Sequence, residues 1–220
     1  MSDVIVEVLE RQRVLPVLTV GDADILPPLV EALIAAGVCA LEITLRTAEA
    51  LDHIRYVVQH HPQVWVGAGT VLSAHQWQAA EQAGARFFVS PCTTPALVAC
   101  AQASAGFWLP GVQTASEIAL ARDQGFRLQK FFPAEAAGGA RALASLAPVF
   151  PDVRFCPTGG VDARNWRDYL ALAAVPFVAG SWLTPASLVA TGDWAAITAR
   201  VRAVCGPEYT LPETQPAGRE

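Results

Sequence analysis

The sequence predicts an α/β fold, a closed (β/α)8 TIM barrel with an extra N-terminal helix. Short β-prone apolar runs recur roughly every 20 to 25 residues, which leaves room for a strand, a loop and a helix in each repeat. Helical patterns lie between these runs and end at Gly or before Pro. The chain of 220 residues matches the compact end of the barrel's size range. An open doubly wound sheet is the alternative, but no Gly-x-Gly-x-x-Gly motif follows the first strand.

The elements follow in order from an amphipathic helix over Met1–Gln12, in which acidic residues alternate with Val and Ile. The eight predicted strands are Leu15–Val20, Ala40–Leu45, Val64–Gly67, Arg86–Ser90, Phe107–Pro110, Leu128–Phe132, Val153–Pro157 and Pro176–Gly180. The helices with the clearest end signals are Ile25–Ala36, Ala48–His61, Ser73–Ala83 and Thr114–Gln124. We therefore predict a single barrel domain over residues 1–205 and a Pro-rich C-terminal tail over 206–220.

Composition and charge narrow the function classes. The formal net charge of −5 argues against a nucleic-acid partner, and an anionic substrate needs local groups to bind it. Phe87–Ser116 and Tyr169–Gly192 lack charge, but Pro and Gly interrupt both, so buried strands and helices are predicted instead of membrane spans. The N-terminus has neither a basic region nor an apolar leader, so we expect a cytoplasmic protein without a membrane partner.

Lys130 is the only lysine among the fifteen Lys and Arg residues. A chain that uses Arg elsewhere keeps Lys where a primary amine is needed, although a biased base composition also explains the imbalance. Phe131 and Phe132 follow Lys130, and Pro133 ends this β-prone run. Partial desolvation by such neighbours favours a nucleophilic amine, which attacks ketones. Lys130 is thus the first candidate for covalent chemistry.

Further candidate residues follow the predicted second and third strands. Glu42, Thr44 and Arg46 are spaced at period two and share one face of a strand whose other residues are apolar. Charged groups that point into a barrel are costly unless they are used, so a functional pair is favoured over a surface ion pair. The third strand runs into Gly67–Thr70, where glycines permit close backbone approach and Thr70 offers a hydroxyl and an N–H.

Glycine-rich turns follow the last two predicted strands. The seventh strand leads into Thr158, Gly159 and Gly160, and the eighth into Ser181. Exposed N–H groups in such turns bind phosphate in TIM barrels, whereas tight connecting turns are the simpler explanation. The sequence thus favours a phosphate site between these two turns.

A metal site is not predicted. All four histidines fall on predicted helices or at a helix end and are interpreted as exposed: His53, His60, His61 and His75. Metal ligands in barrels are expected at strand ends, where none of these histidines lies.

Five ordered motifs resemble the 2-dehydro-3-deoxy-6-phosphogluconate (KDPG) aldolases of the Entner–Doudoroff pathway, which share activity with 4-hydroxy-2-oxoglutarate (KHG) aldolases. The motifs are LEITLRT (Leu41–Thr47), VGAGTVL (Val66–Leu72), KFFPAE (Lys130–Glu135), FCPTGG (Phe155–Gly160) and GSWL (Gly180–Leu183). The resemblance runs from about Val14 to Val204. It implies a lyase that binds pyruvate and a phosphorylated 2-keto-3-deoxy sugar acid, works without cofactor or metal, and forms a homotrimer.

The resemblance also implies a role for each site residue. Lys130 corresponds to the Schiff-base lysine and Glu42 to the acid/base. The residues implied to bind substrate are Arg46 and Thr70 at the pyruvyl carboxylate, Pro91 and Phe132 along the pocket, and Thr158, Gly159, Gly160 and Ser181 at the distal end. Cys92 stands where the family commonly has Gly, which leaves the pocket shape near Pro91 open.

Three alternatives stay open from the sequence. A sister aldolase for the galactonate-derived epimer resembles the same family, and a sugar-phosphate epimerase or isomerase could use Glu42 and Lys130 on the same barrel without an imine. A sugar-phosphate-binding module would retain the phosphate turns without turnover, but it would not need both of these residues. The preferred 2-keto-3-deoxy acid is not determined by the sequence.

Overall fold

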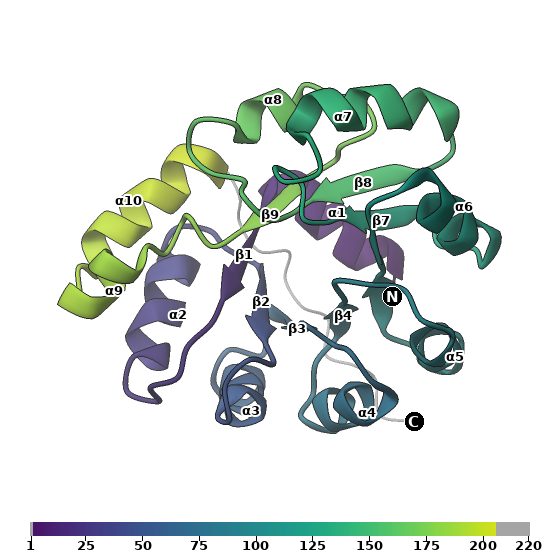
Figure 1. The fold of residues 1–220 in the computed structure, drawn as a ribbon. Helices are drawn as coiled ribbons and strands as arrows, with labels where there is room; N and C mark the ends of the chain where they lie inside the picture. The colour runs from purple at the N-terminus through teal and green to yellow at the C-terminus, as the bar shows by residue number, and fades with distance from the viewer. Residues whose placement is uncertain (1, 206–220) are drawn as a thin grey trace.

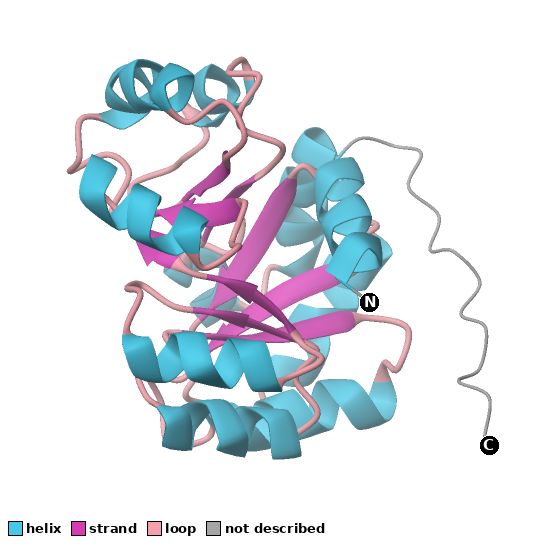
Figure 2. Cartoon of the chain, turned by 90° about the vertical axis from the view of Figure 1, so that its right-hand side faces the viewer, coloured by secondary structure: helices cyan, strands magenta, loops and turns pink. Residues whose placement is uncertain are grey.

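The computed structural model describes residues 2–205 and consists of a parallel sheet surrounded by helices (Figures 1 and 2). Nine short strands supply the eight barrel positions: β1 Val14–Leu18, β2 Ala40–Thr44, β3 Trp65–Gly69, β4 Phe87–Val89, β5 Phe107–Leu109, β6 Gly111–Val112, β7 Leu128–Phe131, β8 Arg154–Pro157 and β9 Val178–Gly180. The predicted barrel is thereby confirmed in architecture. The predicted tail over 206–220 lies outside the described residues.

The barrel is assembled from two hydrogen-bonded sheets. Their strand orders are β5-β4-β3-β2-β1-β9 and β6-β7-β8. Pro110, which has no N–H to donate, separates β5 from β6, so the predicted strand Phe107–Pro110 ends at Leu109 and a second short strand follows the proline. A parallel bridge between Thr158 and Ala179 joins the sheets on the other side. The curled sheet therefore closes at Pro110 and at this bridge.

Helices cover the outside of the sheet (Figure 1). They are α2 Leu26–Ala35, α3 Ala50–His60, α4 Ala74–Gln82, α5 Pro95–Ala103, α6 Ala115–Asp123, α7 Gly139–Leu146, the 3-10 helix Ala147–Val149, α8 Trp166–Leu170, α9 Ala186–Thr191 and α10 Trp194–Cys205. Hydroxyl side chains cap three of them at Ser73, Thr94 and Thr114, which satisfies N–H groups of the first turn. None of the helices within residues 2–205 combines the length and the apolar character needed to cross a membrane.

The additional N-terminal helix α1 (Ser2–Gln12) packs on the strands that line the barrel interior. Its Ile5 and Leu9 are fully buried in one cluster with Leu15 and Phe87. Gln12 fastens the end of the helix, because its amide nitrogen donates to the carbonyls of Val14 and Ala40 at 2.8 and 2.7 Å. Helix α1 therefore closes one end of the barrel, so an active site must lie at the other end.

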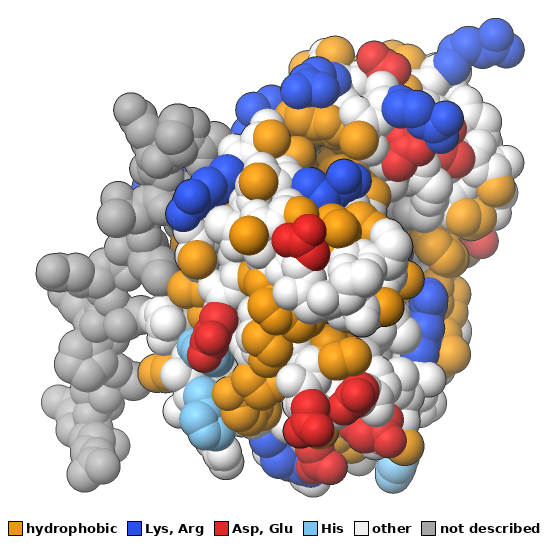
Figure 3. All heavy atoms as spheres, turned by 90° about the vertical axis from the view of Figure 1, so that its left-hand side faces the viewer, with side chains coloured by type: hydrophobic (Ala, Val, Ile, Leu, Met, Phe, Trp, Pro, Cys, Tyr) orange, Lys and Arg blue, Asp and Glu red, His pale blue; other side chains and the backbone are white. Residues whose placement is uncertain are grey.

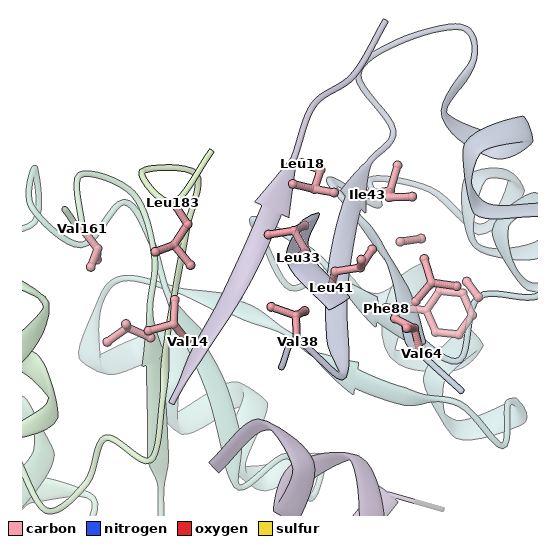
Figure 4. Packing of buried hydrophobic residues seen from close by; sticks show 14 of the residues in the cluster. Val14, Leu18, Leu33, Val38, Leu41, Ile43, Val64, Phe88, Val161 and Leu183 are labelled. Atoms are coloured by element: carbon pink, nitrogen blue, oxygen red, sulfur yellow. The ribbon is translucent and has the colours of Figure 1, made fainter. Parts of the chain in front are cut away.

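Strand β2 shows how the sheet separates core from site. All five of its residues are buried, and Leu41 and Ile43 pack with Leu33 in the cluster between sheet and helices (Figure 4). Alternate residues of a strand point to opposite faces. Glu42 and Thr44 therefore face the barrel interior, as predicted from their spacing.

Charged side chains are distributed unevenly over the surface. On the face drawn in Figure 3, a group of acidic side chains lies toward the lower end, basic and acidic side chains are interspersed toward the upper end, and apolar ones lie between them. Such a face supplies no uniform positive field for an anion. A phosphorylated ligand needs donors in its own site.

Candidate active site

One small cavity gathers most of the predicted site residues. Its volume is about 150 Å³, and its lining comprises Val17, Glu42, Thr44, Arg46, Lys130, Phe132, Thr158, Gly159, Gly160, Val161, Gly180 and Ser181. These residues belong to β1, β2, β7, β8, β9 and the loops that follow them. The cavity therefore opens at the carboxyl ends of the strands, where TIM barrels carry their chemistry.

Glu42 is the buried acid of this cavity, with 1% of its surface exposed. Its Oε2 has no hydrogen-bond partner. Burial raises the pKa of the Glu42 carboxyl, and the positive charges of Lys130 and Arg46 oppose this only in part. Gly69 on the neighbouring strand makes room for the carboxyl, because a Cβ there would lie 1.9 Å from Glu42 Oε1. The geometry holds a carboxyl that keeps its proton more readily than an exposed glutamate does, as a general acid requires.

Lys130 lies in the middle of β7 and is 4% exposed. Its backbone N–H donates to the Pro110 carbonyl at 2.8 Å, which anchors β7 at the break between β5 and β6. Its Nζ lies 4.8 Å from the centroid of the Phe132 ring. On the adjacent strand, Cys156 is opposite Lys130, and burial raises the pKa of its thiol to about 12. Cys156 is therefore a neutral neighbour and no competing nucleophile.

Arg46 and Thr70 meet at the mouth of the cavity. Arg46 Nε donates to Thr70 Oγ1 at 3.1 Å. Thr70 adopts a left-handed backbone conformation with φ of 58°, which is uncommon for a residue other than glycine. Thr70 does not line the cavity itself. Its hydroxyl instead holds the guanidinium of Arg46, which lines the cavity.

The turn after β8 is built to expose N–H groups. Gly159 and Gly160 have φ of 90° and 80°, and within the described part of the chain the N–H groups of Gly159, Gly160 and Val161 have no acceptor. Successive free N–H groups in such a turn form a concave site for anions. Ser181, which follows β9, is exposed on the same cavity wall. This arrangement presents hydrogen-bond donors to an anion, and the phosphate site stays a prediction.

Three lining residues were not among the candidates from the sequence: Val17, Val161 and Gly180. Thr44, which the spacing of the second strand had singled out, lines the cavity on the same inner face of β2 as Glu42. Its hydroxyl lies 2.7 Å from that of Thr19. Val17 is apolar, so the sequence around it cannot distinguish a residue that lines a cavity from one that packs in the core.

Pro91, like Thr70, is a predicted site residue that lies outside the cavity lining. It packs instead against Gly111, where an added Cβ would lie 2.2 Å from the Pro91 carbonyl carbon and 2.5 Å from the Cys92 nitrogen. Gly111 is the register partner of Lys130. Pro91 and Cys92 therefore lie against β6, the strand that pairs with the Lys130 strand.

No metal centre is formed in the described part of the chain, where no three His, Cys, Asp or Glu side chains converge. His60 and His75 are exposed on helices, as predicted. The prediction is wrong for His53, which is 3% exposed because it lies on the inner face of α3, and His61 at the end of that helix is only partly exposed.

A larger hollow of about 460 Å³ lies at the opposite end of the barrel, at the amino ends of β8 and β9. Its lining is apolar except for Arg154, whose guanidinium pairs with Glu10. It offers neither a nucleophile nor a proton-transfer group. The smaller cavity around Lys130 is thus the better candidate for an active site.

Comparisons with known proteins point to one family. Residues 5–200 match the family model of the KDPG and KHG aldolases. The chain is 50% identical over 186 residues to a 2-dehydro-3-deoxy-phosphogluconate aldolase of Pseudomonas aeruginosa, with 84% of each chain covered.

Two solved structures have the same fold. KDPG aldolase from Legionella pneumophila, with pyruvate captured at low pH as a covalent carbinolamine intermediate, superposes with a TM-score of 0.88 at 39% identity, covering 90% of this chain and 97% of that one. The KDPG aldolase of Zymomonas mobilis ZM4 with 3-phosphoglycerate gives 0.86 at 42% identity, covering 93% and 96%. By sequence and fold together, this chain belongs to the KDPG and KHG aldolase family.

Proposed function

We propose that this protein is a class I aldolase that cleaves KDPG to pyruvate and glyceraldehyde 3-phosphate, and KHG to pyruvate and glyoxylate. The proposal is carried by one observation: Lys130 and Glu42 are buried in a single cavity whose far wall is a turn of unpaired N–H groups. The pyruvate carbinolamine captured in the Legionella relative and the 3-phosphoglycerate in the Zymomonas relative support it.

The first half of the reaction forms a Schiff base. The neutral amine of Lys130 attacks the C2 ketone and gives a carbinolamine. Glu42, in its protonated form, donates a proton to the carbinolamine oxygen, which leaves as water while the nitrogen lone pair forms the iminium. The raised pKa of Glu42 favours the protonated form that this step needs.

The second half breaks the carbon–carbon bond. The Glu42 carboxylate takes the proton of the C4 hydroxyl, the C3–C4 electron pair moves toward the iminium, and the aldehyde leaves. Protonation of the resulting enamine at C3 restores an iminium, and addition of water then releases pyruvate and the free amine of Lys130. The iminium is the electron sink, so no step requires a metal.

The remaining site residues divide between the two ends of the substrate. Arg46, held by Thr70, is proposed to bind the pyruvyl carboxylate, and Phe132 and Pro91 border the chain between C1 and C4. The phosphate end is assigned to Thr158, Gly159, Gly160 and Ser181. The homotrimer and the cytoplasmic location stay predictions, and light scattering on the purified protein tests the trimer.

Borohydride reduction in the presence of pyruvate tests the mechanism. Lys130 is the only lysine of the chain, so the side-chain adduct has one possible site. We expect one pyruvyl adduct at Lys130 in peptide mapping. An adduct at the N-terminal amine alone, or none at all, contradicts the aldolase mechanism and favours an epimerase or isomerase on this barrel.

A further inference from the structure

The Gly159–Gly160 turn keeps both of its carbonyl groups occupied. The N–H of Glu135 donates to the Gly159 carbonyl at 3.0 Å, and Asn165 Nδ2 donates to the Gly160 carbonyl at 3.0 Å. The carbonyl oxygens are thereby engaged with the loop after β7 and the start of α8. The N–H groups of the turn remain for a ligand.

Glu135 places a carboxylate directly beside this turn. A Cβ added to Gly160 would lie 2.5 Å from Glu135 Cβ and 2.6 Å from its Cγ, so the side chain runs along the glycine. An anion next to a phosphate site repels its ligand unless it is held away. Glu135 is exposed, so packing alone does not restrain its carboxylate.

Tyr169 supplies the restraint. Its side chain is fully buried in α8, and its hydroxyl donates to Glu135 Oε1. Burial and the adjacent carboxylate raise the pKa of Tyr169, so the hydroxyl keeps its proton and remains a donor. Arg164 follows the same turn, but its guanidinium bonds to Asp162 at 2.6 and 3.0 Å. The tyrosine hydroxyl is the donor that directs Glu135.

Resting on the aldolase proposal, we infer that Glu135 and Tyr169 are positioning residues for the phosphate end of the substrate. The Tyr169 hydroxyl holds the Glu135 carboxylate away from the N–H groups of Gly159 and Gly160. While the hydrogen bond between Tyr169 and Glu135 is present, these N–H groups can bind a phosphate without a competing negative charge nearby. The pair thus acts on affinity for phosphorylated substrates and leaves the chemistry at Lys130 unchanged.

The test removes the hydrogen bond between Tyr169 and Glu135 by changing one partner at a time. Tyr169→Phe removes the donor, and Glu135→Asp keeps the charge but is one methylene too short to reach it. For both variants we expect KM for KDPG to rise about tenfold, because the released carboxylate repels the phosphate, whereas KM for KHG, which lacks a phosphate, stays within about twofold. Inorganic phosphate should inhibit KHG cleavage about tenfold less tightly than in the wild type.

A rescue experiment separates charge from shape. Glu135→Gln in the Tyr169→Phe background removes the repelling charge, so KM for KDPG should return to within about threefold of wild type. Tyr56→Phe, which deletes a hydroxyl on α3 away from the cavity, is the matched control. Circular dichroism establishes that each variant is folded, and Glu135→Asp serves alone if the buried Tyr169 variant is not.

Two results would overturn the inference: equal losses on KDPG and KHG, or a double variant that binds KDPG no better than Tyr169→Phe. Neither result would contradict the aldolase proposal, because the aldolase proposal is tested separately by the pyruvyl adduct at Lys130 of the wild-type protein. A missing adduct with intact phosphate selectivity would refute the aldolase proposal instead.

Discussion

Replacing Gly69 by alanine tests whether Glu42 must occupy its observed position. The added Cβ would lie 1.9 Å from Glu42 Oε1, 2.5 Å from Cδ and 2.6 Å from Cγ. Non-bonded atoms need about 3.5 Å, so the carboxyl must move by roughly 1 to 1.5 Å. A misplacement of about 1 Å at a reacting group costs on the order of 100-fold in rate. We therefore expect kcat for KDPG cleavage to fall about 100-fold.

The substitution also overpacks a buried strand, which costs about 1 to 3 kcal/mol of folding free energy. Thermal unfolding should therefore be measured, and activity assayed well below the transition. Gly21→Ala is the matched control, since an added Cβ there meets only Thr47 Cγ2 at 3.9 Å. We expect this control to retain wild-type kinetics.

The decisive comparison is made in the Glu42→Gln background. If Gly69 acts only by placing Glu42, the alanine adds little further loss once the carboxylate is gone. Losses that multiply would show that Gly69 has a separate role. Wild-type kcat in the single Gly69→Ala variant would refute the argument that the position of Glu42 limits the rate.

Glu42→Gln keeps the shape of the side chain but cannot transfer protons, so kcat should fall by about 10² to 10⁴-fold. Because burial raises the pKa of Glu42 in the folded state, the native protein binds this proton more tightly than the unfolded chain, and wild-type stability falls as pH rises above the ordinary carboxyl range. Denaturant unfolding should thus find Glu42→Gln more stable than wild type at pH 8 and the difference smaller at pH 5; a constant difference contradicts this. Thr158→Val removes a hydroxyl that borders the cavity and donates to the Cys156 carbonyl at 3.3 Å. If this hydroxyl binds the hydroxyl at C4, where KDPG and its galactonate-derived epimer differ, kcat/KM for KDPG relative to the epimer should fall about fivefold to tenfold. An unchanged ratio in steady-state kinetics shows that Thr158 does not distinguish the two epimers. Exhaustive chelation should leave activity intact, because the iminium is the electron sink; loss that a divalent cation restores would overturn the mechanism.

The regular recurrence of strand and helix signals along the sequence was sufficient to predict the fold and part of the candidate site. Strand and helix signals alternate eight times in a chain of this length, which favours a closed parallel barrel, and the missing Gly-x-Gly-x-x-Gly motif argues against the open doubly wound sheet. The spacing of Glu42, Thr44 and Arg46 predicted one inward face, since side chains alternate along a strand. A lone lysine between apolar neighbours pointed to covalent chemistry before any contact was known.

What the sequence determined by itself was therefore the repeat and the residues that follow each strand, both of which depend on local spacing. Only the tertiary structure decided which of those residues meet: it opened space for Glu42 at Gly69, left Thr70 and Pro91 outside the cavity lining, buried His53 and joined Tyr169 to Glu135. These outcomes depend on contacts between segments far apart in the chain. Their geometry is set by how strands and helices pack, a property that no local pattern of residues encodes.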